Sequence, residues 1–128
     1  MKILGIGVDI VENKRIDKLI RNKSFIKRTF GNKEVIFSKN LSKKTNYYAK
    51  RFAAKESFAK SLGTGFRNNL NFKDIEILNN KAGKPYYLIS QKINNIIKKK
   101  FKIKKFDLFL SISDEKEYSV AFTILQLK

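Results

Sequence analysis

A long amphipathic segment at residues 45–62 constrains this chain more than any other feature of its sequence. Drawn as a helix, its aromatic and aliphatic side chains cover one broad arc that has to be buried. Its second half, RFAAKESFAKSLGTG at 51–65, nevertheless places Arg51 and Lys55 inside that arc and Glu56 at its edge. Gly63 and Gly65 predict where the helix ends, because glycine readily adopts the left-handed conformation of a C-cap. The three charges on or beside the apolar arc each need an explanation.

Shorter segments on both sides of this helix show either a strand or a helix pattern. Strands are predicted at 2–11, 72–78, 84–88, 107–113 and 117–125, the last two as a hairpin around 114–116. Helices are predicted at 13–28, 34–41 and 91–99, with Ser90 as the N-cap of the last one. This order predicts an α+β fold in which a largely antiparallel sheet packs with the long helix, as a single domain over 1–128.

Two residue types that carry much of protein chemistry are absent. The sequence has no cysteine, which excludes disulfides, thiolate nucleophiles and cysteine-based zinc sites. It has no histidine either, which removes the usual general base at neutral pH and the commonest metal ligand. Chemistry in this chain therefore has to use carboxylates, lysine, tyrosine, hydroxyl groups, water or a hard metal such as magnesium or manganese.

The chain is strongly basic, with a formal net charge of +18. This charge fits a polyanionic partner such as nucleic acid, an anionic membrane, an acidic protein or a phosphorylated small molecule. The abundance of Lys and Asn fits a general compositional bias equally well, and the lysine-rich run at 98–105 is expected to be a solvated face or loop. No apolar run approaches the roughly 20 residues of a membrane span, and the N-terminal residues do not resemble a signal peptide. We therefore expect a cytoplasmic location.

The first strand carries a carboxylate on a face that otherwise holds glycines. Gly5, Gly7 and Asp9 alternate along the strand and share one face. Glycine inside a strand often marks the close approach of a ligand or of another backbone. The alternative is an edge strand with two bulge glycines and one solvated aspartate.

The charges of the long helix also allow two interpretations. Glu56 and Lys60 are four residues apart and could form an ordinary salt bridge worth about 0.3–0.5 kcal/mol. Glu56 could instead be a metal ligand, with Lys60 beside it for an anionic substrate. The Gly63-Thr64-Gly65 turn is first of all a C-cap, since phosphate-binding loops usually precede a helix rather than follow one.

Four segments together resemble one family. They are GIGVDIVENKRI at 5–16, RFAAKESFAKSLGTG at 51–65, NFKDIEIL with GKPYY at 71–87, and LSIS with EKEYSVAF at 110–122. Their order and spacing resemble the holo-acyl-carrier-protein synthases, the short single-domain class of 4'-phosphopantetheinyl transferases. The resemblance covers nearly the whole chain, and its most specific parts are the GxDI strand and the RFAxKE helix.

The resemblance implies an enzyme that transfers the 4'-phosphopantetheine arm of coenzyme A to a serine of apo-acyl carrier protein, leaving adenosine 3',5'-bisphosphate. It implies a magnesium ion held by Asp9 and Glu56, with Lys60 stabilising the leaving group. It also implies a homotrimer with active sites between subunits, and neither nucleic acid nor membrane as a partner. The implied coenzyme A contacts are Lys60, Gly63, Thr64, Gly65 and Arg51, and the implied carrier-docking residues are Arg15, Lys18, Arg21 and Arg28.

One position departs from the family pattern. Asp114 follows the S-I-S of the penultimate strand, where the family usually has a histidine, and a carboxylate there would repel a phosphate. Two other hypotheses remain open at this point. One is a basic RNA- or DNA-binding domain, which requires aromatic side chains exposed among Lys and Arg, as Phe109 could be. The other is a family member that binds coenzyme A or the carrier without catalysing transfer, for which Asp114 is the only support.

Overall fold

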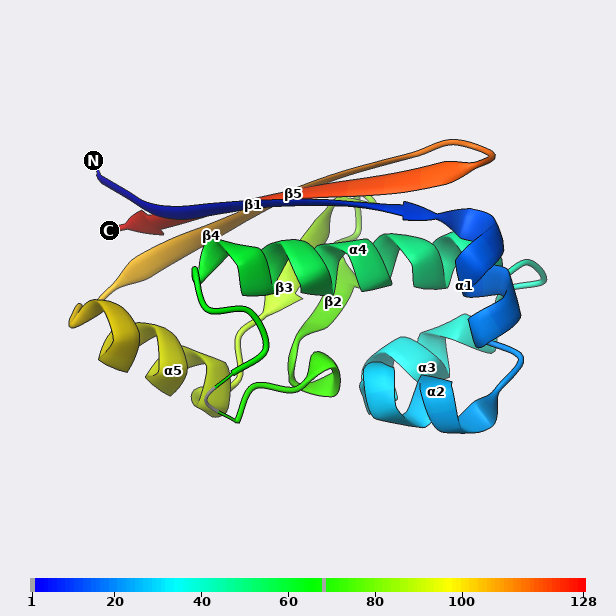
Figure 1. The fold of residues 1–128 in the computed structure, drawn as a ribbon, viewed down its shortest axis with the longest axis horizontal. Helices are drawn as coiled ribbons and strands as arrows, with labels where there is room; N and C mark the ends of the chain where they lie inside the picture. Colours follow the sequence, from blue (N-terminus) through cyan, green and yellow to red (C-terminus); the bar gives the residue numbers. More distant parts are fainter. Residues whose placement is uncertain (1, 68) are drawn as a thin grey trace.

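The computed structural model describes residues 2–67 and 69–128. Its elements in chain order are β1 (Lys2–Glu12), α1 (Asn13–Leu19), α2 (Lys23–Thr29), α3 (Asn32–Ser38), α4 (Thr45–Ser61), the 3-10 turn η1 (Phe72–Asp74), β2 (Glu76–Asn79), β3 (Pro85–Leu88), α5 (Gln91–Phe101), β4 (Phe106–Asp114) and β5 (Tyr118–Leu127) (Figure 1). The predicted α+β architecture is confirmed, as are the long helix, the strand at the N-terminus and the C-terminal hairpin.

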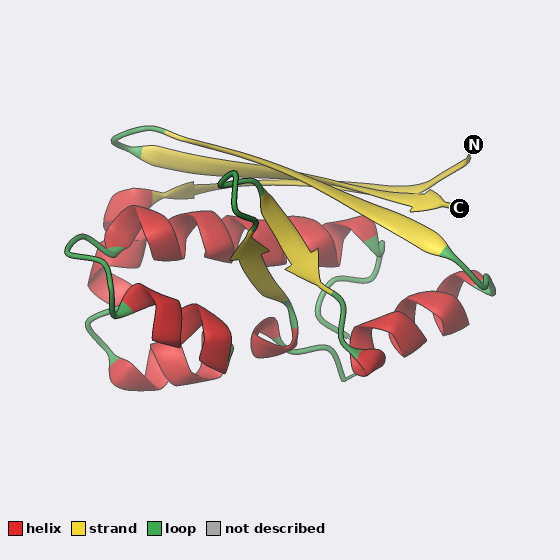
Figure 2. Ribbon diagram, turned by 180° about the vertical axis from the view of Figure 1, so that it is seen from behind, coloured by secondary structure: helices red, strands yellow, loops and turns green. Residues whose placement is uncertain are grey.

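The strands of the described residues form two antiparallel sheets. One has the order β1-β5-β4 and the other pairs β2 with β3. Helix α4 runs along one face of the larger sheet, and the other helices and the β2–β3 hairpin lie on that same side (Figures 1 and 2). The core therefore sits between this sheet and α4, where Ala121 and Leu125 of β5 meet Ala53 and Phe58 of α4 in one buried cluster.

Two glycines of β1 explain how closely the strand lies on α4. A Cβ atom added at Gly7 would be 1.8 Å from the carbonyl oxygen of Ser57, and one added at Gly5 would be 1.8 Å from that of Ser61. Any side chain at these positions would push the strand away from the helix. The space that the sequence reserves at Gly5 and Gly7 is thus filled by the backbone of α4 and not by a ligand. The edge-strand alternative is also partly right, since β1 is an edge of its sheet and has a register irregularity between Ile3 and Gly5.

A buried ion pair joins α4 to the elements beneath it. The Lys55 Nζ lies 2.6 Å from Glu34 Oε1, both side chains are fully buried, and the ammonium also donates to the carbonyl oxygens of Phe72 and Ile75. The Glu34 carboxylate accepts from two backbone amides besides, those of Gly31 and Ile77. Because each charge has several partners, the desolvation that normally disfavours a buried ion is largely offset. This network explains the presence of Lys55 in the apolar arc.

The opposite face of the larger sheet is apolar and is covered by no element of the described residues (Figure 2). Ile6, Val8 and Ile10 of β1 are 53–64% exposed, and Phe122 and Phe109 stand beside them on β5 and β4 at 40% and 47%. We call this the outer sheet face. Single exposed apolar side chains are normal on a monomer, whereas adjacent ones on neighbouring strands are typical of contact surfaces.

Three predicted elements have wrong boundaries. The helix predicted over 34–41 is α3 at Asn32–Ser38. The helix predicted over 13–28 is two helices, because the Asn22 side chain accepts hydrogen bonds from the amides of Ser24 and Phe25 and so starts α2 anew. The strand predicted over 72–78 begins later, because Asp74 accepts a hydrogen bond from the amide of Asn71 and closes the turn η1 before β2. The predicted N-cap at Ser90 is confirmed by its bond from the amide of Ile93.

Candidate functional site

Asp9, Glu56 and Lys60 converge where β1 crosses α4. The Lys60 ammonium lies 3.1 Å from Asp9 Oδ1 and also donates to the carbonyl oxygen of Val8 at 3.0 Å. The Asp9 side chain is only 17% exposed, whereas that of Lys60 is 54% exposed. Lys60 thus pairs with the strand carboxylate and not with Glu56, its neighbour one turn back on the helix. The close approach that Gly7 permits is what brings the two elements into this register.

The electrostatics of Glu56 show that the two carboxylates act on each other. Partial burial raises the pKa of Glu56, and the nearby charge of Asp9 raises it further, while Lys60 and Arg15 oppose the shift. A half-buried carboxylate beside a second one disfavours its own ionised form, and a cation between them would relieve that cost. We call Asp9, Glu56 and Lys60 together the carboxylate cluster.

The donor set of the cluster suits a hard divalent cation. Within residues 2–67 and 69–128 no group of three or more Asp or Glu side chains gathers to hold a metal ion. Magnesium does not require such a cage, because it commonly takes one or two carboxylates and fills its remaining positions with substrate phosphates and water. Two mutually repelling carboxylates that are open to solvent on one side fit this pattern.

The four predicted docking residues lie on α1, on α2 and in the turn between them. Arg15, Lys18, Arg21 and Arg28 are all exposed. Arg21 pairs with Asp17 at 3.1 Å, and Arg28 donates to the hydroxyl of Ser24 at 2.9 Å. The Arg15 guanidinium stands over the Phe52 ring of α4 at 5.6 Å and contributes to the field at Glu56. The basic surface of α1 and α2 therefore reaches the edge of the carboxylate cluster.

Arg51 lies away from the carboxylate cluster. Its guanidinium stacks on the Tyr47 ring at 3.8 Å and donates to the Asn79 side chain of β2 at 3.1 Å. The side chain is 4% exposed and burial lowers its pKa. Its Nε has no hydrogen-bond partner among the residues that the structure describes. It lines a pocket of about 140 Å³ whose other lining residues are Lys50, Asn79, Gly83, Pro85, Ile112 and Asp114. A buried guanidinium with an unsatisfied donor beside a pocket is suited to an anion.

Asp114 lies in that same pocket at the end of β4. Its carboxylate accepts from the Asn46 side chain at 2.8 Å and lies 3.9 Å from the Lys50 ammonium. The Asn46 amide hydrogen-bonds the carboxylate, and the Lys50 ammonium offsets part of its charge. The repulsion expected from the sequence is therefore weaker than that of a free carboxylate, because Lys50 stands beside it.

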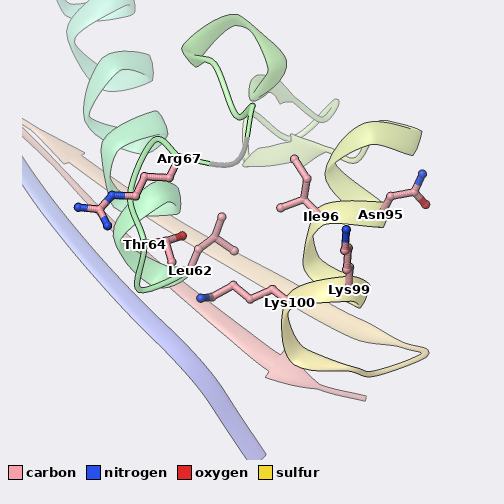
Figure 3. Close-up of a pocket in the computed structure, with 7 residues that line it drawn as sticks. All are labelled: Leu62, Thr64, Arg67, Asn95, Ile96, Lys99 and Lys100. Carbon is pink, nitrogen blue, oxygen red and sulfur yellow. The ribbon is translucent and has the colours of Figure 1, made fainter.

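The glycine turn after α4 has the predicted cap geometry. Gly63 and Gly65 have φ values of +80° and +67°, and the amide of Gly65 donates back to the carbonyl oxygen of Ala59. Thr64, between them, lines a separate pocket between the end of α4 and helix α5 (Figure 3). Sequence reasoning treated Lys99 and Lys100 as part of a solvated run, yet both line this pocket, and so does Arg67. No local pattern could have found them, because their position depends on how α5 docks.

Comparison with known proteins gives a consistent result over the whole chain. Residues 5–123 match the model of the 4'-phosphopantetheinyl transferase superfamily. A holo-(acyl-carrier-protein) synthase of Pelagibacter ubique is 60% identical over 128 residues, which is all of both chains. A protein of the same name from Clostridium beijerinckii is 42% identical and covers 97% of this chain and 98% of its own length.

Solved structures of similar proteins share the fold. A crystal structure of holo-(acyl-carrier-protein) synthase from Neisseria meningitidis has a TM-score of 0.86 at 36% identity, covering 98% of this chain and 99% of the other. A synthase from Bacillus anthracis, crystallised in complex with CoA (3',5'-ADP), has a TM-score of 0.81 at 35% identity and covers 98% of each chain. No helix among the described residues has both the length and the apolar character that a membrane crossing requires.

Proposed function

Because this chain belongs to the 4'-phosphopantetheinyl transferase superfamily, as a holo-(acyl-carrier-protein) synthase, we propose that the carboxylate cluster is its reaction centre. The enzyme transfers the 4'-phosphopantetheine arm of coenzyme A to a serine of apo-acyl carrier protein and releases adenosine 3',5'-bisphosphate. The observation that carries the assignment of the centre is the convergence of Asp9, Glu56 and Lys60 from two elements at the crossing of β1 and α4.

The reaction places charge where this cluster can offset it. Attack of the serine hydroxyl on the β-phosphorus builds negative charge on the phosphoryl oxygens and on the departing phosphate. The Lys60 side chain is more than half exposed and flexible, so its ammonium could pair with the negative charge that develops on the departing phosphate. Asp9 and Glu56 would hold Mg²⁺, which when bound supplies Lewis-acid neutralisation of the pyrophosphate. The mutual repulsion of the two carboxylates supports this role.

The carrier protein would dock on the basic surface of α1 and α2. Arg15, Lys18, Arg21 and Arg28 are exposed there, and Arg15 borders the carboxylate cluster. Acyl carrier proteins are acidic, so opposite charges would steer the encounter and the attraction would weaken with salt. Docking of an acidic carrier would therefore explain part of the net charge of +18.

Coenzyme A would contact Lys60, the Gly63-Thr64-Gly65 turn and Arg51. Within one chain Arg51 lies on the β2–β3 side of α4, whereas Lys60 lies on the β1 side. We infer that the enzyme is a homotrimer in which the Arg51 pocket of one subunit completes the carboxylate cluster of its neighbour. The apolar outer sheet face supports an assembly, because its exposed Ile6, Val8 and Ile10 lie on the same strand as Asp9.

Subunit complementation tests this shared site. Glu56→Ala and Arg51→Ala are each expected to be inactive, but after mixing and subunit exchange about one quarter of the sites would hold both native residues, the random expectation for a closed ring. Recovery of activity to about that level supports the shared site. Activity that stays absent after verified exchange would place Arg51 and Glu56 in the same site of one chain.

The transfer itself is tested by intact-mass spectrometry of the carrier. The protein is mixed with apo-acyl carrier protein and coenzyme A, with magnesium or with excess chelator. A gain of one phosphopantetheine on the carrier only with magnesium is the expected result. If a carrier that another synthase modifies gains no mass, the assignment of transferase activity is overturned and a protein that only binds coenzyme A or the carrier is favoured. Asp114→His would then be the next variant to test. The cytoplasmic location stays a prediction for cell fractionation.

A further inference from the structure

A second pocket lies beyond the carboxylate cluster, between the end of α4 and helix α5 (Figure 3). Its volume is about 450 Å³, within the range of small-molecule sites, and its lining residues are Leu62, Thr64, Arg67, Asn95, Ile96, Lys99 and Lys100. Leu62 follows Glu56 by six residues, which corresponds to about 9 Å along a helix axis. The pocket is therefore a neighbour of the reaction centre. It shares no residue with the carboxylate cluster, but it borders the proposed coenzyme A contacts at Thr64.

The lining of this pocket combines an apolar wall with charge of a single sign. Ile96 is half-buried and offers apolar surface to the pocket, as do the methylene stems of the exposed Lys99 and Lys100. Leu62, on the facing side, is 2% exposed and closes the pocket floor. Every charged lining residue is a cation, and none is acidic. The Lys100 side chain reaches from α5 across toward Leu62 and Thr64, whereas Arg67 extends away from α5 (Figure 3).

The two lysines have no competing acid nearby. In the described part of the chain no carboxylate lies within 4.0 Å of the Lys99 or Lys100 ammonium, whereas Lys50, Lys60 and Lys92 each have an acidic partner. A lysine can line an apolar pocket with its methylene stem and keep its ammonium at the solvent edge. The edge of this pocket is thus positively charged while its wall is apolar.

We propose that this pocket binds a single-chain anionic amphiphile, a medium-chain carboxylate. The chain would lie against Ile96 and the methylene stems of the lysines, and the carboxylate would pair with the Lys100 ammonium, which reaches across the pocket toward Thr64 (Figure 3). A neutral chain would leave those cations unused, and a small inorganic anion would leave the apolar wall unused. Only a ligand that has both parts matches both features of the lining.

The first test is binding to the wild-type protein, measured by calorimetry and by amide chemical shifts. Decanoate below its micelle concentration is compared with decanol, which has the same chain without the charge, and with acetate, which has the charge without the chain. We expect one saturable decanoate site with shifts at Leu62, Thr64, Ile96 and Lys100, binding about tenfold tighter than octanoate because two more methylenes are buried. Equal binding of decanol would overturn the proposal, because the pocket would then recognise an uncharged chain.

Matched lysine variants separate this pocket from the general charge of the protein. Lys100→Gln removes a lining ammonium, and Lys104→Gln makes the same change in the same lysine-rich run at a residue that does not line this pocket. We expect Lys100→Gln to weaken decanoate binding about tenfold and Lys104→Gln to leave it unchanged. Equal weakening by both variants, or binding of many decanoate molecules per chain, would reduce the effect to non-specific attraction and overturn the proposal. The substituted side chains are exposed, so both variants should fold.

Discussion

Lys55 and Lys60 of α4 form the same kind of ion pair in opposite surroundings. Lys55 contacts Glu34 with both side chains fully buried, and further hydrogen bonds to the two groups fix the pair in one geometry. Lys60 contacts Asp9 with its own side chain 54% exposed, next to a second carboxylate whose pKa is raised. One pair holds α4 to α3 and β2, while the other leaves charge accessible for a substrate. The comparison teaches that burial and the number of partners, more than the residue types, decide whether an ion pair supports the fold or the chemistry.

The largest effect on turnover is expected from the two carboxylates of the carboxylate cluster, Asp9 and Glu56. Asp9→Ala or Glu56→Ala should abolish magnesium-dependent transfer, with a loss of at least about a thousandfold in turnover, or about 4 kcal/mol. The reason is that each variant removes one of the two carboxylates proposed to hold the ion, which weakens its binding and shifts its position relative to the pyrophosphate. Intact-mass turnover assays, with circular dichroism and size-exclusion profiles as controls for fold and assembly, measure this effect. Turnover near that of the wild type in either variant would remove that residue from the metal site.

A pair of identical substitutions tests the comparison directly. Lys55→Met leaves the Glu34 carboxylate buried without its cation and should cost about 3–5 kcal/mol of unfolding free energy. Lys60→Met removes a cation that is more than half exposed, and it should change stability by no more than about 1 kcal/mol while it lowers turnover. Urea unfolding measures the first quantity and the transfer assay measures the second. Equal stability losses in the two variants would contradict the distinction between the two ion pairs.

These two lysines also show which parts of the molecule sequence alone could predict. Lys60 and Glu56 lie in a specific local motif, and the resemblance assigned both from one stretch of the chain. The partner of Lys55 is Glu34, 21 residues away on another helix, so no periodicity indicated it. The long helix and the C-terminal hairpin were predictable because their patterns repeat over many residues.

Other features depended on contacts between distant segments and escaped sequence analysis for that reason. Alternation predicted the strand at 2–11 but could not tell that its Ile6–Val8–Ile10 side would be the uncovered one. A single side-chain cap at Asn22 divided a segment whose apolar period looked continuous. The pocket at Lys100 exists only because α5 docks beside the end of α4.

A smaller effect on activity is expected from Arg15, where the basic surface of α1 borders the carboxylate cluster. Arg15→Glu reverses a charge at the edge of the carboxylate cluster and should raise the KM for apo-acyl carrier protein about tenfold, with less change in the KM for coenzyme A. The effect should shrink as salt is added, since exposed charges are screened. Lys104→Glu, in the lysine-rich run beyond α5, is a matched charge-reversal control. If both substrates are affected equally, Arg15 does not belong to the docking surface.

The smallest effect is on the free energy of unfolding, which the ionised Glu56 carboxylate lowers. Burial and the neighbouring Asp9 raise the pKa of Glu56 in the folded protein above that of the unfolded chain. At neutral pH without magnesium the charged form therefore disfavours folding, and Glu56→Gln should increase stability by less than about 1 kcal/mol, because solvent screens a half-exposed group. The gain should fade as pH falls through the raised pKa, since protonation then neutralises Glu56 in the wild type as well. Urea unfolding in the presence of chelator from pH 4 to pH 8 measures this change in stability. The gain expected for Glu56→Gln contrasts with the loss expected for Lys55→Met. A loss of stability in Glu56→Gln at neutral pH would contradict this prediction, because it would mean that the charged Glu56 carboxylate stabilises the fold.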